Sequence, residues 1–326
     1  MRGWLTPLAL LVALGGVYGT SQAAQDWPTR PVKIVSPFAP GGGSDTMARL
    51  LADELSRSLG QQFFVENRPG ASGLIGSAAV ANSPPDGYTF LMGSVGTHVI
   101  APATNSHAGF DPIKDFTHIA YLGGPPNVIV VHPSLGVKSL AELTALLKTR
   151  TDPMPFVSPG PGTIGHLFAE LWAAKAGVKL THIAYKGSGQ AMNDLVAGHV
   201  KLGSITWTGA LGQIRGGSVI PLAVSASRRM PEFPQVPTMK DLGYPDLVAT
   251  TWFGIVGPAG VPKPIVTRLH DAIARALQAP ELRKRMETDG IDAEPMSAEA
   301  FTRYNEAELA KWGPIAREAL GQPAAK

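Results

Sequence analysis

The sequence predicts an α/β protein made of two domains, and three observations support this prediction. Short apolar strands, glycine-rich turns and amphipathic helices alternate from residue 32 onward, which is typical of sheets covered by helices. Glycine-rich turns at residues 37–45 and 158–163 each follow a strand and precede a helix, one in each half of the chain. The length of 326 residues suits two domains of about 150 residues.

The first half of the chain predicts a series of strands that each run into a turn. The strands are expected at residues 32–36, 63–65 and 88–92, and the helices at 44–59 and near 74–82. Met47, Leu51 and Leu55 recur at helical spacing, Ser44 or Asp45 can cap their helix, and Gly60 ends it. A loop at 93–98 follows the third strand. Ligands bind at the carboxyl ends of parallel strands, so the loops at 37–45 and 93–98 are expected at one ligand-binding edge.

The second half repeats this alternation after a crossing point at residues 123–126. Strands are expected at 128–132, 155–158, 181–185 and 219–225, and helices after Ser139, over 163–176, near 190–197 and briefly around 239–242. A buried strand at 251–256 is expected to cross back, followed by helices at 262–278, 280–289 and 297–319 that pack onto the first domain. We therefore predict one domain from residues 25–123 plus 250–326 and a second from 124–249.

The N-terminus predicts a secretory signal peptide over residues 1–24. Arg2 precedes an apolar run at residues 5–17, and small residues at Ser21 and Ala23 suit cleavage near Ala23 or Ala24. A membrane anchor is the alternative, but the run is shorter than the ~20 residues that a span needs. The chain has no cysteine, which excludes disulfides and thiolate metal sites. We expect a periplasmic protein that relies on its core for stability.

The charge balance excludes nucleic acid as a partner. The formal net charge is only +3, and no basic run of five or more residues is present. The dinucleotide fingerprint is matched at Gly160, Gly162 and Gly165, but the next strand lacks the acidic residue that would hold a ribose. Walker A, nucleophile-elbow and zinc-protease motifs are absent from the sequence. We therefore expect no cofactor, no metal and no enzymatic activity.

The two glycine-rich turns predict a cleft that holds one anion from both sides. Backbone N–H groups at a helix N-terminus bind a carboxylate or phosphate without a charged side chain. His98, His166 and the pair Tyr185 and Lys186 fall near the same predicted edge, and a hydrogen-bonding or packing role explains each histidine as well. Trp207 either lines the cleft or packs in the core.

Several segments together resemble the extracytoplasmic solute receptors of the tripartite tricarboxylate transporters, the Bug receptor family. They extend over nearly all of the mature chain. The segments are residues 27–33, 37–45, 65–71, 85–89, 185–187, 221–224, 237–238 and 254–262. The resemblance implies a type II-like periplasmic binding protein fold, with two domains joined by two crossing strands and closing on a small carboxylate.

The resemblance also implies which residues hold the ligand. Adding His98 and Trp207 from the residue-based argument, the candidate ligand-binding residues are Phe38, Pro40, Gly41, Gly42, Gly43, Ser44, Ser94, Thr97, His98, Gly162, Thr163, His166, Tyr185, Lys186 and Trp207. Family members that take amino acids are expected to carry an acid near the strand after Gly198, and residues 201–206 contain none. This favours a plain mono- or dicarboxylate, or an aromatic acid if Trp207 faces the cleft.

Three functions are compatible with these residues. The first is a monomeric, non-catalytic receptor that delivers its carboxylate to membrane permease subunits of a tripartite tricarboxylate transporter. The second is an exported enzyme acting on a carboxylic acid, with His98, His166 or Lys186 as acid or base, for which the sequence offers no identifiable nucleophile–base pair. The third is the ligand-binding component of a sensor system.

Overall fold

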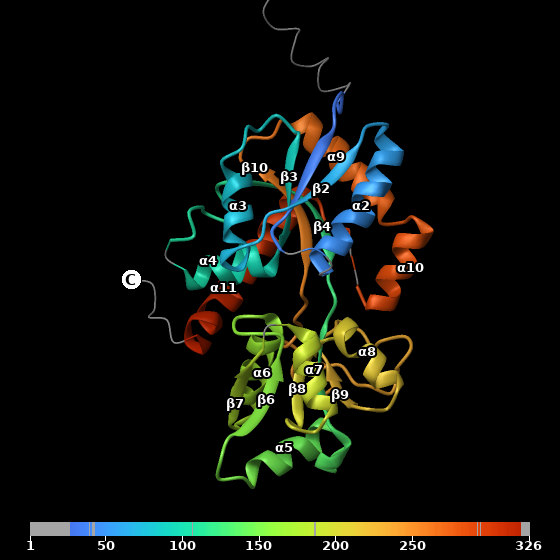
Figure 1. Cartoon of the computed structure of the whole chain (residues 1–326). Helices are drawn as coiled ribbons and strands as arrows, with labels where there is room; N and C mark the ends of the chain where they lie inside the picture. Colours follow the sequence, from blue (N-terminus) through green and yellow to red (C-terminus); the bar gives the residue numbers. More distant parts are fainter. Residues whose placement is uncertain are drawn as a thin grey trace, which may run out of the picture.

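The protein folds into two α/β lobes, one above the other in Figure 1. The computed structural model describes residues 27–320 except 39, 41, 42, 106, 186, 292 and 294, so the predicted signal peptide lies outside the described residues. Within the described part of the chain, no helix combines the length and the apolar character needed to cross a membrane.

The first lobe is built on a mixed five-stranded sheet. Its order is β2 (Phe63–Asn67), β1 (Val32–Ser36), β3 (Thr89–Ser94), β10 (Phe253–Pro258) and β4 (Phe116–Gly123). β1 is parallel to β2 and β3, whereas β10 is antiparallel to both its neighbours. The expectation of a parallel sheet is wrong for β10, because this strand enters from the other lobe and therefore runs the opposite way.

Helices cover both faces of this sheet (Figure 1). They are α2 (Gly43–Leu59), α3 (Leu74–Ala81), α4 (Ala101–Thr104), α9 (Lys263–Ala276), α10 (Pro280–Asp289) and α11 (Ala298–Ala319). α9 packs on α2 and β4, and α11 packs on β4, which confirms that the C-terminal helices return to the first lobe. Apolar side chains of β1, α2 and α9, such as Ile34, Leu51 and Ile273, form a shared core.

The second lobe repeats the design with the strand order β7 (Leu180–Ala184), β6 (Met154–Ser158), β8 (Leu202–Thr206), β5 (Asn127–Val131) and β9 (Ile220–Val224). β5 is antiparallel to its two neighbours. Its helices are α5 (Leu140–Lys148), α6 (Ile164–Ala176), α7 (Ser188–Val196) and α8 (Trp207–Arg215). The sequence pattern did not predict β4 or α8.

Two further expectations are corrected. Residues 93–98 are not a loop, because β3 continues to Ser94 and Gly96–Ile100 form a helical turn that leads into α4. The expected helix near residues 239–242 is a set of turns in which Leu242 N–H donates to the Met239 carbonyl. Gly243 and Pro245 follow at once, so the turn cannot propagate into a helix.

Two connections join the lobes and lie side by side. Residues 124–126 link β4 to β5, and the chain returns through residues 249–252 into β10. Thr251 N–H donates to the Pro125 carbonyl at 2.9 Å, and Pro126 pairs with Thr250 in an antiparallel bridge. A Cβ on Gly124 would lie 2.2 Å from the Thr251 carbonyl oxygen, so only glycine permits this approach.

Candidate functional site

The first candidate loop joins β1 to α2 at the edge of the upper lobe. The Phe38 side chain is half-buried. Its ring lies next to Gly73 and Gly96, where the lack of a side chain leaves room for it. The Ser44 hydroxyl is buried in the first turn of α2 and has no hydrogen-bond partner among the described residues. Gly41 and Gly42 lie outside the described residues, and Pro40 and Gly43 are exposed. A helix start with an unpaired buried hydroxyl suits a hydrogen-bonding anion.

Ser94 and Thr97 form a closed hydrogen-bonded turn after β3. Thr97 Oγ1 accepts from Ser94 N–H at 2.9 Å and can donate to the Ser94 carbonyl at 3.1 Å. It also lies 3.0 Å from Nδ1 of His98. The Thr97 hydroxyl is therefore used inside the turn, and its side chain is fully buried. The turn can contribute to a ligand through its backbone and through Ser94.

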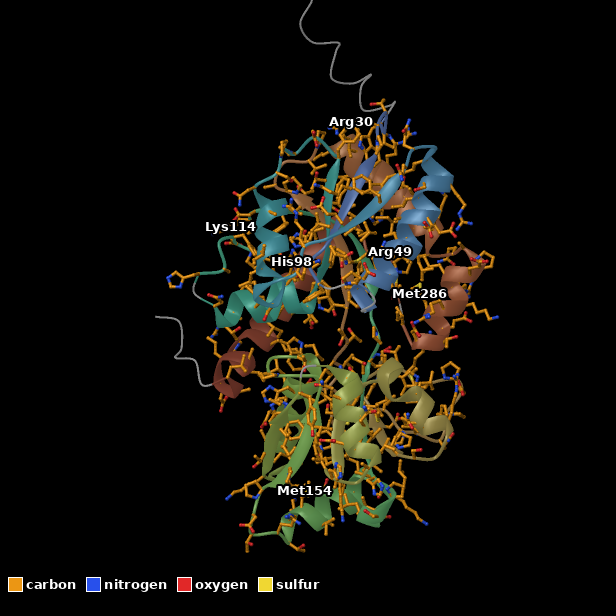
Figure 2. All side chains as sticks on the ribbon, viewed as in Figure 1. Arg30, Arg49, His98, Lys114, Met154 and Met286 are labelled. Atoms are coloured by element: carbon orange, nitrogen blue, oxygen red, sulfur yellow. The ribbon has the colours of Figure 1, made fainter. Side chains whose placement is uncertain are left out.

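His98 lies in the upper lobe, where Figure 2 labels it, and is fully buried. Its ring packs against Phe116 at 4.7 Å between centroids. Burial, and after it the neighbouring His118, lowers the pKa of His98 to about 3. His98 is thus neutral at ordinary pH and reaches the candidate site only through Thr97.

The turn between β6 and α6 uses most of its N–H groups internally. Gly160 N–H donates to Ser158 Oγ at 3.2 Å, and Gly162 N–H donates to Nδ1 of His166 at 3.2 Å. Thr163 caps α6, because its Oγ1 accepts from His166 N–H, and the same hydroxyl donates to the Gly160 carbonyl at 2.8 Å. We expected both turns to offer free N–H groups, and this turn offers fewer than expected. The sequence alone does not show the hydrogen bonds that use these groups.

Two histidines brace this second turn. The rings of His166 and His182 stack with centroids 3.9 Å apart. Burial, and then the charge of His182, lowers the pKa of His166 to about 4, while burial raises the pKa of Glu170 beside it. His166 is neutral, so its Nδ1 can accept the bond from Gly162, and its role is to hold the turn.

Ser158 and His182 form a hydroxyl–imidazole pair that the sequence did not predict. Ser158 Oγ lies 2.8 Å from His182 Nε2. The Ser158 side chain is fully buried, and its hydroxyl also bonds to both the N–H and the carbonyl of Gly160. A buried hydroxyl that is engaged in a turn is not available to attack a substrate. The pair therefore stabilises the turn.

The remaining candidates in the second lobe are dispersed. The Tyr185 hydroxyl donates to Asp194, and this bond raises the pKa of Tyr185 to about 12. Lys186 lies outside the described residues. Trp207 is buried, with its ring edge-to-face against Phe233 at 5.6 Å. This packing gives Trp207 a core role, and Trp207 also lines the hollow described below.

The structure brings the second turn against the upper lobe. A Cβ on Gly162 would lie 3.3 Å from Cγ2 of Ile100 and 3.2 Å from Cδ1 of Leu320. Ile100 ends the helical turn that begins two residues after Ser94, and Leu320 follows α11. The β6–α6 turn of the second lobe therefore lies against the upper lobe, next to the helical turn that follows Ser94 and to the residue after α11.

A separate hollow of about 570 Å³ lies between the connections, α10, α11 and the segment after β9. Of the candidate residues, only Trp207 lines it. No group of three or more histidine, aspartate or glutamate side chains that could hold a metal occurs in the described part of the chain.

Comparison of this sequence with known proteins gives the same family over most of the chain. Residues 47–320 match the family described as "Tripartite tricarboxylate transporter family receptor". Protein BugT of Bordetella pertussis is 34% identical over 319 residues, covering 98% of each chain. Solved structures agree: Rpa4515 of R. palustris with adipate is 35% identical with a TM-score of 0.79, covering 90% of this chain and 98% of that chain. MatC (Rpa3494) from Rhodopseudomonas palustris with bound malate is 31% identical with a TM-score of 0.75, covering 89% and 100%.

Proposed function

Since the chain belongs to the tripartite tricarboxylate transporter receptor family, we propose that it captures a small mono- or dicarboxylate between its lobes and presents it to the membrane subunits of such a transporter. The family consists of solute receptors and not of enzymes. Solved relatives are periplasmic binding proteins. We place this chain in the periplasm as a monomer, exported by the signal peptide over residues 1–24.

The observation that carries the proposal is the meeting of the β6–α6 turn with the upper lobe. The turn lies against Ile100 and Leu320 of that lobe, and the start of α2 in the same lobe retains an unpaired buried hydroxyl at Ser44. A carboxylate held by such groups would bridge the lobes and favour the closed arrangement. Adipate and malate, the acids bound by two relatives, support a dicarboxylate of four to six carbons.

The proposed ligand contacts divide into two groups. Residues 38–44, Ser94 and the 95–97 backbone would hold one carboxylate, and Gly162, Thr163, Tyr185 and Lys186 would hold the rest of the acid. His98, His166 and Trp207 would not contact the ligand and would instead stabilise the loops or the core. We propose domain limits at 25–123 plus 250–326 and at 124–249, which agree with the strands that each sheet contains.

The test is to identify what the protein carries. The mature chain is purified and unfolded, and any released small molecule is identified by mass spectrometry, followed by thermal-shift titration with mono- and dicarboxylates. One acid released in stoichiometric amount, which raises the melting temperature when it is added back, is the expected result. No bound molecule and no shift with any acid would count against the proposal.

A further inference from the structure

Asn67 connects the two ends of the first candidate loop. It ends β2, directly opposite Ser36 at the end of β1. Its Nδ2 donates to the Phe38 carbonyl at 3.1 Å and to Oδ1 of Asp45 at 2.8 Å. Phe38 opens the loop, and Asp45 lies in the first turn of α2. Both N–H hydrogens of this one side-chain amide are therefore donated to the two ends of the loop.

Arg49 completes the arrangement from the next turn of α2. Its guanidinium donates twice to the Asp45 carboxylate, at 3.0 Å each, and once to Oδ1 of Asn67 at 3.0 Å. Figure 2 shows Arg49 on the lower part of the upper lobe. The Asp45 side chain is only 5% exposed, so its charge at the helix start would oppose a carboxylate ligand if Arg49 did not balance it.

We propose that Asn67 is a positioning residue for the ligand-binding loop. It ties the Phe38 carbonyl and Asp45 to the end of β2, so that Phe38 and the first turn of α2 are held in place before an acid arrives. The bond to the Phe38 carbonyl belongs neither to the sheet nor to a helix, and its direct effect is on the loop. Preorganisation of this kind raises affinity because less order remains to be imposed on binding. The inference rests on the proposed function, since it assumes that this loop holds the carboxylate.

The experiment separates the loop bond from the rest of the cluster. Asn67→Asp removes both donated bonds with almost no change in shape. The double exchange Asn67→Asp with Asp45→Asn swaps the two side chains. Position 45 then carries the amide and position 67 the carboxylate, with which Arg49 can still pair. The Phe38 carbonyl is left without its donor. Asn82→Ala is the matched control, because Asn82 Nδ2 also donates to a backbone carbonyl of the upper lobe, that of Ala78 at 2.8 Å.

Melting temperature and affinity for adipate are measured for each variant, or for malate if that is the acid the wild-type chain binds. Asn67→Asp should lower both, with affinity reduced tenfold or more. The double exchange should recover the melting temperature while affinity stays at least tenfold below wild type, and Asn82→Ala should bind as wild type does. Unchanged affinity in Asn67→Asp, or affinity that recovers together with stability in the double exchange, overturns the proposal.

A ligand-free measurement distinguishes failure of this inference from failure of the proposed function. The Gly43 amide signal is followed by NMR of protein labelled with ¹⁵N-glycine, without any acid. Asn67→Asp should shift and broaden this signal, and Asn82→Ala should not. An unchanged Gly43 signal overturns the positioning role. A changed signal in a protein that binds no acid confirms the tie on the loop and counts against the proposed function alone.

Discussion

At the scale of single residues, Gly73 shows how tightly the first loop and the Ser94–Thr97 turn are packed together. Its φ is +91°, and a Cβ there would lie 2.6 Å from Cγ2 of Thr97 and 3.3 Å from Cζ of Phe38. Gly73→Ala should therefore lower the free energy of unfolding by about 2 kcal/mol and weaken acid binding. Gly212→Ala, in α8 with no atom within 4 Å, is the control. It should stabilise the protein by up to about 1 kcal/mol, measured by urea unfolding. Equal effects of the two variants would contradict the packing described for Gly73.

Buried histidines make the stability depend on pH. Burial lowers the pKa values of His98, His118 and His166 to about 3, 4 and 4. The unfolded chain, with histidine pKa values near 6.5, then binds more protons between pH 6.5 and 4, so stability is complete above pH 6.5 and falls as the pH drops. Each histidine contributes a slope of about 1.4 kcal/mol per pH unit in that window.

The variant that checks this is His166→Asn, whose side-chain oxygen can still accept from Gly162 N–H but does not titrate. Its unfolding free energy should fall less steeply than that of the wild type between pH 6.5 and 4. Glu308, whose pKa burial raises, contributes with the opposite sign in both proteins and cancels in the comparison. Parallel pH profiles for the two proteins would show that His166 is not buried as a neutral base.

At the scale of elements, the start of α6 combines stability with binding. Thr163→Val removes the hydroxyl that caps α6 and bonds to the Gly160 carbonyl, so it should cost about 1 kcal/mol of stability and about 1 kcal/mol or more of acid affinity. Ser139→Ala is a matched control, because Ser139 caps α5 in the same lobe through Glu142 N–H. It should cost similar stability and leave calorimetric affinity unchanged. Unchanged affinity in Thr163→Val, or an equal loss of affinity in both variants, would remove Thr163 from the site.

Local pattern predicted most elements and missed those without a local signal. β1, α2, α6 and α9 carry clear apolar periodicity, caps or bounding turns, and they lie within a residue or two of their predicted limits. β4 is almost wholly buried and lacks alternation, and α8 contains two glycines, so neither stands out from its sequence. The direction of β5 and β10 depends on how the chain crosses between lobes, which no short window encodes.

For the candidate site, the sequence predicted positions in the chain but not the bonds around them. Glycine-rich turns between strand and helix have a physical signature, and the one at residues 158–163 lies against the upper lobe. The bonds that hold these turns join residues distant in sequence, such as Asn67 to Phe38 and Ser158 to His182. Partners of this kind are set by tertiary packing, and no local pattern distinguishes Asn67 from an ordinary turn residue.

At the scale of the whole molecule, we propose two lobes that close on an acid about a pair of adjacent connections. Contacts at the Gly162 turn join the second lobe to Ile100 and Leu320, and the paired connections at Pro126 and Thr250 would serve as the hinge. An acid bound by both turns would hold the lobes together, whereas an acid bound by one lobe alone would leave their separation unchanged.

A site shared between the lobes is tested by small-angle X-ray scattering of the mature chain during titration with the acid it binds. We expect a saturable decrease in the radius of gyration that follows occupancy. Full occupancy by the acid with no change in the radius of gyration would contradict a site shared between the lobes.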